Sequence, residues 1–236
     1  MEIARRLSER EICRIFYPNS STLTAAERRK LDSAVKYVER DRKVFDEVLI
    51  GRLKGAAVNA ITFPDKRVIV DYRLVRCLDQ DQLISVMGHE AYHAKHSKRM
   101  LGVAAVSQVA VWASGVAAVY FGALSTPVQD TMVHLGFLDI PALAATAYAG
   151  LSSAQLAVGK VVTAIKRREE TKADLNALNH GSAQSMISAL ETMRAANGDV
   201  YTSYEGKVLG LVNRFIGLFE PHPKFGKRID VLRKHV

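Results

Sequence analysis

The chain has 236 residues, a formal net charge of +9 and a hydrophobic content of 48%. This composition supports a buried core and excludes an intrinsically disordered protein, while the scatter of the basic residues in short clusters argues against a nucleic-acid binding protein. The two cysteines, Cys13 and Cys77, lie far apart without the spacing of metal ligands, so neither a disulfide framework nor a thiolate zinc site is expected.

Residues 1–54 are expected to form amphipathic helices ahead of the main domain. Apolar residues recur at roughly helical spacing from Ile3 to Phe16, before Pro18 ends the segment. The string "TAAE" at residues 24–27 has the pattern of a capping box and opens a second helix. The first segment is charged and has no uninterrupted apolar stretch, so we expect no secretory signal and a reducing compartment for the main domain.

The pattern then changes to that of strands. Alternating or β-branched residues occur in "AVNAITF" and "RVIVDY", which Pro64 and Asp65 divide with a turn signal. We expect a small antiparallel sheet here and helices elsewhere, which is an α+β fold class that is mostly helical.

A helix is expected over residues 79–99, and it contains the string "GHEAYHAKH". On a helix, His89 and His93 are one turn apart on one face, so both imidazoles reach a single tetrahedral ion. Glu90 projects beside them toward a water on that ion, in the arrangement H-E-x-x-H. Because this short string also arises by chance on polar helix faces, the metal interpretation requires a third ligand.

Two stretches without charged side chains follow, at residues 101–129 and 140–159. The first exceeds the roughly 20 residues that cross a bilayer, and Lys and Arg flank the outer ends of the pair but are missing from its connection. We therefore expect an apolar helical hairpin at about residues 101–160, inserted in a membrane with both ends on the cytoplasmic side. Small residues in it favour close packing and a homo-oligomer. The alternative is a pair of Ala-rich helices buried in a soluble cytoplasmic protein.

A third ligand is available in "KRREETKADLNAL". Glu170 and Asp174 stand one turn apart in a helical pattern, so Glu170 would complete a site of two histidines and one carboxylate. Asp174 would accept a hydrogen bond from the far ring nitrogen of a liganding histidine, His89 being the expected donor. Glu169 is the adjacent alternative, but it points about 100° away. His96 would lie about a turn past the ion on a straight helix, so it is expected to be a polar neighbour and not a ligand.

Residues 55–236 resemble the HtpX-like zinc metalloendopeptidases, the family that includes the CAAX prenyl protease. Four strings carry this resemblance in order, namely "VNAITFPDKRVIVDYRLVRCL", "DQLISVMGHEAYHAKH", "REETKAD" and "PHPKFGKRIDVL". The chain departs from the family at Ala91, where a bulkier aliphatic residue is usual, and at Asp71 and Tyr72, which replace small residues.

The resemblance implies a gluzincin-type metallopeptidase domain that binds Zn2+. The implied zinc ligands are His89, His93 and Glu170. Glu90 would take a proton from water and pass it to the leaving amine. His222 would lie near the metal, either donating to the oxyanion or capping the zinc, and Arg228 would steady that loop or bind the substrate backbone.

The strand that contains Asn59 and Ala60 would offer an open edge to an extended polypeptide substrate. The sequence therefore predicts a zinc metalloendopeptidase that acts on protein substrates, in membrane-protein quality control or processing. The alternatives are a catalytically inactive zinc-binding membrane adaptor and a basic module that binds membrane surfaces or nucleic acid. A closed structural zinc site would need four protein ligands, which disfavours the adaptor.

Overall fold

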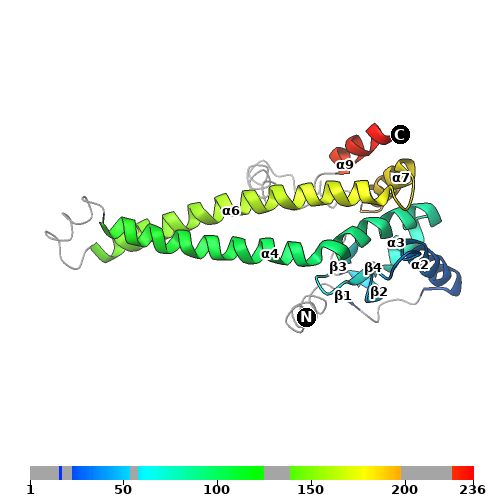
Figure 1. The fold of residues 1–236 in the computed structure, drawn as a ribbon, viewed down its shortest axis with the longest axis horizontal. Helices are drawn as coiled ribbons and strands as arrows, with labels where there is room; N and C mark the ends of the chain where they lie inside the picture. Colours follow the sequence, from blue (N-terminus) through cyan, green and yellow to red (C-terminus); the bar gives the residue numbers. More distant parts are fainter. Residues whose placement is uncertain (1–15, 18–22, 54–57, 125–138, 198–224) are drawn as a thin grey trace.

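The computed structural model describes residues 16–17, 23–53, 58–124, 139–197 and 225–236. Two long helices, α4 (Gln80–Leu124) and α6 (Asp139–Ala177), lie side by side and extend away from a part that contains a small sheet and the shorter helices (Figure 1). The fold is mostly helical and of the α+β class, as the sequence predicted.

The sheet contains four strands in the order β1-β2-β4-β3. These are β1 (Phe16–Tyr17), β2 (Glu47–Leu53), β3 (Ala60–Thr62) and β4 (Arg67–Asp71). β3 and β4 form the expected antiparallel pair across the turn at residues 64–65, and β1 is antiparallel to β2.

The prediction of an antiparallel sheet is wrong for the central pair, because β2 and β4 run parallel, with Val48 opposite Val68. The chain reverses direction between β3 and β4, so β4 again runs in the direction of β2. An alternating sequence pattern predicts a strand but contains no information about the direction of its partner. β3 lies at the edge of the sheet, on the far side of β4 from β2.

The shorter helices begin at local capping signals. The capping box that opens α2 (Ala25–Val38) is confirmed, since Thr24 N donates to Glu27 Oε2 at 2.7 Å and Glu27 N donates to Thr24 Oγ1 at 3.2 Å. The Asp71 side chain caps α3 (Tyr72–Cys77), and the Ser182 side chain caps α7 (Ala183–Ala196). The chain ends with α9 (Phe225–Leu232) and a 3-10 turn, η3 (Arg233–His235).

Two of the predicted helices are not described by the structure. Residues 2–15 of the expected N-terminal helix lie outside the described residues, and so does the stretch "KVLGLVNRFIGLF" at residues 207–219, whose apolar pattern predicts a further helix. Phe16, the last residue expected in the first of these helices, belongs to β1.

The main core lies between the sheet, α2 and the first turns of α4. Its fully buried residues include Leu31, Val68, Val70, Leu83 and Met87. The division between an N-terminal part, residues 1–54, and a main domain, residues 55–236, stays a prediction. α2 from the first part and the later elements both contribute residues to this core. The buried face of α4 holds its first turns against the sheet, and this packing fixes the position of the residues that follow Met87.

The helix that was expected to end near Arg99 continues as one helix to Leu124, so the predicted end was wrong. The sequence changes from polar to apolar after Arg99, but no proline accompanies the change, and the glycine there, Gly102, costs a helix only about 1 kcal/mol. On the distal part of α4, large apolar side chains are exposed at Val106, Val109, Trp112 and Val116.

No helix within the described part of the chain combines the length and the apolar character needed to span a bilayer. The connection between the two long helices, at residues 125–138, lies outside the described residues. The apolar hairpin inserted in a membrane stays a prediction.

Candidate metal centre

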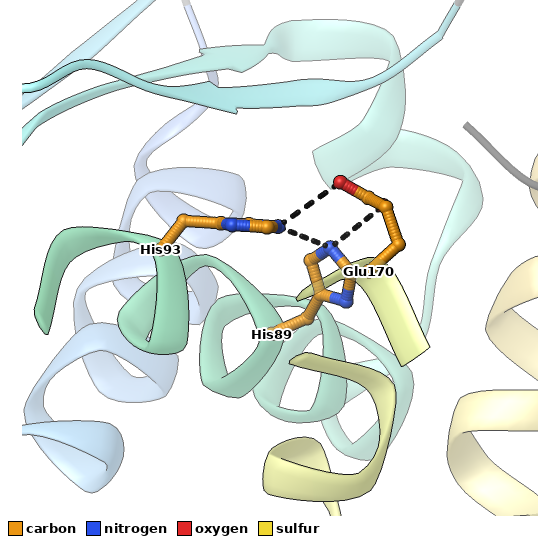
Figure 2. Close-up of side chains that lie close together, drawn as sticks. All are labelled: His89, His93 and Glu170. Atoms are coloured by element: carbon orange, nitrogen blue, oxygen red, sulfur yellow. Dashed lines mark hydrogen bonds and ion pairs between the residues drawn. The ribbon is translucent and has the colours of Figure 1, made fainter. Parts of the chain in front are cut away.

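The local structure at the start of α4 sets the register of the helix face that carries His89 and His93. Asp79 and Gln82 cap the helix reciprocally, each backbone N–H donating to the other side chain, at 2.9 and 2.8 Å. Two turns later His89 and His93 lie one turn apart, and their Nε2 atoms approach to 3.1 Å (Figure 2). The two imidazole rings are T-shaped to each other, with centroids 4.8 Å apart.

Glu170 reaches the same point from α6. Its Oε1 lies 3.3 Å from His93 Nε2, and its Oε2 lies 3.6 Å from His89 Nε2 (Figure 2). The three donor groups all lie within 4.8 Å of one another. Two segments that are about 80 residues apart in the sequence therefore present three ligand atoms to one small volume.

The separations of these atoms fit a zinc ion. Zinc binds histidine nitrogen and carboxylate oxygen at about 2.0–2.2 Å, and tetrahedral bonds of that length place neighbouring donors about 3.3 Å apart. The two Nε2 atoms are 3.1 Å apart and Glu170 Oε1 lies 3.3 Å from His93 Nε2, both close to this value, while the other carboxylate oxygen, Oε2, lies 3.6 Å from His89 Nε2. Two imidazoles and one carboxylate leave the fourth position of a tetrahedron open, as catalytic zinc sites do.

Asp174 orients His89 through the ring nitrogen that faces away from the site, Nδ1. His89 Nδ1 donates to Asp174 Oδ1 at 2.8 Å, which leaves the lone pair of Nε2 directed at the site. Arg228, from α9, donates to both oxygens of the same carboxylate, Nε to Oδ2 at 2.8 Å and Nη2 to Oδ1 at 2.5 Å. The Asp174 side chain is 1% exposed, so this ion pair is buried.

The charges around the site shift two pKa values. Burial alone would raise the pKa of Asp174, but the hydrogen bonds from His89 and Arg228 outweigh burial and lower it. Burial alone would lower the pKa of His93, but the hydrogen bond to Glu170 and the negative charges of Glu90 and Glu170 raise it. In the metal-free site a proton therefore competes with a cation for His93.

Glu90 follows His89 in α4 and is 5% exposed, and its negative charge acts on His93. Thr62, the last residue of β3, donates its hydroxyl to Glu90 Oε2 at 2.6 Å. Sequence reasoning missed this contact. The available signal was that Ala60 and Thr62 are two residues apart, so they share the face of the strand that packs on α4.

The two residues that were considered and set aside as ligands have other partners. Glu169 accepts hydrogen bonds from Tyr92 Oη at 2.7 Å and from Lys172 Nζ at 2.8 Å. His96 Nδ1 donates to the Tyr92 carbonyl at 2.9 Å, and its ring stacks on Tyr92 with centroids 4.1 Å apart. Neither belongs to the group of possible metal ligands in the described part of the chain.

Comparison with known families agrees with this geometry. The model of peptidase family M48 matches residues 26–236, which is most of the chain. The chain belongs to peptidase family M48. This confirms the HtpX-like resemblance of the four motifs, and the match begins before the region in which they occur.

The M48 chain is also similar to a protein named "Protease HtpX homolog" from Thermococcus kodakarensis. The two sequences are 28% identical over 186 residues, which cover 71% of this chain and 59% of that protein. The M48 chain thus spans about three fifths of the length of this relative.

The remaining predicted site residues of the M48 chain have different placements. Asn59 immediately precedes β3, and its carbonyl accepts a hydrogen bond from the Asp71 amide at 3.1 Å, while Ala60 begins the strand and is buried. Arg228 is held against Asp174. His222 lies outside the described residues.

Proposed function

We propose that this M48 chain is a zinc-dependent endopeptidase that hydrolyses peptide bonds of protein substrates. The observation that carries the proposal is the approach of His89, His93 and Glu170 at separations suited to tetrahedral zinc, with the buried Glu90 next to His89 in the same helix. Family membership supports it independently.

Each polar residue at the site has a role in this proposal. A zinc ion held by the three ligands would supply Lewis-acid chemistry, polarising a peptide carbonyl and acidifying a water. Glu90 takes the proton of the attacking water and delivers it to the leaving amine. Asp174 keeps His89 in the tautomer whose Nε2 is a ligand.

Arg228 has the role of keeping Asp174 charged and in place. Its side chain is 10% exposed and donates twice to Asp174, and its Nη1 lies 3.9 Å from Glu170 Oε2. This position favours the steadying role for Arg228 over direct contact with a substrate backbone. His222 keeps the role implied by family resemblance, as a residue near the metal that donates to the oxyanion or caps the zinc.

The polypeptide substrate is proposed to pair with the edge of β3, next to Asn59 and Ala60. The position of β3 at the edge of the sheet supports this, as does the contact of its last residue with Glu90. Pairing of backbone with backbone tolerates many side chains, which suits a protease that removes or processes varied proteins.

We propose that the distal parts of α4 and α6 contact a membrane, with the catalytic part on the cytoplasmic side. The exposed apolar residues 106, 109, 112 and 116 fall within about 120° around an ideal helix. Exposed Lys98 and Lys166 lie where the apolar parts of the two helices begin and end. Alkaline carbonate extraction of cell membranes tests this, since release of the protein into the supernatant favours the soluble alternative. The homo-oligomer stays part of the same proposal, through close packing of small residues.

Proteolysis by variants matched in chemistry tests the central proposal. Fluorescently labelled casein should be cleaved by the zinc-loaded chain, and a chelator should abolish cleavage. Glu90→Gln should retain zinc and lose turnover, while Glu191→Gln, on an exposed position of α7, should retain both. Zinc binding without chelator-sensitive cleavage would support the inactive adaptor instead, and wild-type turnover by Glu90→Gln would refute the role of Glu90.

A further inference from the structure

The contact between Thr62 and Glu90 goes beyond the metal ligands and their supports. Thr62 Oγ1 lies 2.6 Å from Glu90 Oε2 and 3.3 Å from the Glu90 carbonyl oxygen. A hydroxyl has one proton to donate, and the shorter distance is typical of a charge-assisted bond to an ionised carboxylate. The proton of Thr62 is therefore assigned to the carboxylate.

This hydrogen bond determines which oxygen of Glu90 remains for chemistry. Within the described residues, Thr62 is the only side chain that hydrogen-bonds to the Glu90 carboxylate. Glu90 is buried, so a carboxylate oxygen without a donor would be unfavourable, and the rotamer that places Oε2 on Thr62 is stabilised. Oε1 is then the oxygen that is left to accept a proton from water.

Thr62 itself is held by the sheet and not by the helix that carries Glu90. It is the last residue of β3, and it lies opposite Val68 in the antiparallel pair with β4. Val68 is fully buried in the main core. The position of the hydroxyl is thus set by a strand that the core immobilises.

We propose that Thr62 is a positioning residue for hydrolysis, which holds one oxygen of Glu90 so that the other is directed to the proton of the attacking water. This inference rests on the proposed endopeptidase function. It also joins the general base to β3, the strand proposed to pair with the substrate, so one short strand orients both the base and the peptide.

The test uses the zinc-loaded full chain and labelled casein. Thr62→Val keeps the volume and the β-branching but removes the hydroxyl, and Thr62→Ser keeps the hydroxyl. Thr62→Val should lower kcat by about ten- to a hundredfold, the range for loss of a hydrogen bond to a charged group, with KM and bound zinc close to wild type. Thr62→Ser should recover most of the turnover.

A control variant on the neighbouring strand separates positioning from damage to the sheet. Ile69, on β4 opposite Ile61, packs with Phe63 in a separate apolar cluster, so Ile69→Val perturbs the sheet without touching Glu90. It should leave kcat unchanged. If Thr62→Val fails to fold by circular dichroism, Thr62→Ala replaces it in the comparison with Thr62→Ser.

The outcomes distinguish this inference from the proposed function. The positioning role is overturned if Thr62→Val has the kcat of wild type, if it changes only KM, or if Thr62→Ser loses as much kcat as Thr62→Val. The endopeptidase function still holds in each of these cases, provided that the wild type cleaves casein and Glu90→Gln does not. Absence of chelator-sensitive cleavage in the wild type overturns the proposed function itself.

Discussion

Replacing Arg228 by leucine should destabilise the protein strongly, because it would leave the Asp174 carboxylate buried with His89 as its remaining partner. Arg228 donates two hydrogen bonds to a side chain that is 1% exposed, and the arginine side chain is itself 10% exposed. Removing one member of a buried ion pair typically destabilises a protein by about 3–5 kcal/mol. For a chain of this size each kcal/mol lowers Tm by about 2–4 °C, so a decrease of roughly 6–12 °C is the minimum expected.

The matched control is Arg233→Leu, five residues further along the chain. The Arg233 side chain is 61% exposed and its guanidinium lies 3.6 and 3.8 Å from exposed carboxylates, so its loss should change stability by less than about 0.5 kcal/mol. Both variants are compared by thermal unfolding, with a chelator and again with zinc. Equal shifts in Arg228→Leu and Arg233→Leu would refute the reasoning.

The effect of Arg228→Leu should also depend on pH. The pKa of Asp174 is lowered in the folded protein, because hydrogen bonds from His89 and Arg228 outweigh burial. The stability that this carboxylate contributes is therefore fully present above about pH 4, its ordinary pKa, and is lost as pH falls through the lower folded value. The difference in Tm between wild type and variant should be largest near pH 7 and should shrink in acid.

Three further predictions concern the metal site and its surroundings. Asp174→Asn should weaken zinc binding by about 10–100-fold, because it disturbs the hydrogen bond that orients His89, and competition with a chromophoric chelator measures this; unchanged affinity would contradict it. Because the pKa of His93 is raised, apparent zinc affinity should begin to fall at a pH above about 6.5 as the solution is acidified, and a flat zinc titration between pH 8 and 6 would disprove it. Tyr92→Phe should lower stability by about 1–3 kcal/mol in chemical denaturation, since buried Glu169 loses the Tyr92 hydroxyl, and a variant as stable as wild type would show that the contact is unimportant.

The parts of the site that sequence alone predicted are those that follow from helical spacing. His89 and His93 share a face because they are four residues apart, and the same spacing relates Glu170 to Asp174. The structure brings these two pairs together, with the separations already given. The roles assigned to them stay proposals.

The contacts that sequence did not predict depend on packing between distant elements. Arg228 lies 54 residues after Asp174, and its spacing within α9 gives no indication of its partner. Thr62 resembles any threonine of an edge strand until the sheet is placed against α4. Likewise, the parallel pairing of β2 with β4 depends on the path of the chain between them and not on the pattern of either strand.

The three possible metal ligands come from two helices whose connection along the chain lies at their far ends. His89 and His93 lie on α4 and Glu170 lies on α6, so an ion bound by all three would link the two helices to each other. The distance along α4 from His93 to its last residue is about 46 Å at 1.5 Å per residue. The ion would therefore link the two helices at a point far from their distal ends. Relative movement of the distal ends would therefore alter the coordination of the ion, and loss of the ion would remove one link between two helices that also pack against each other.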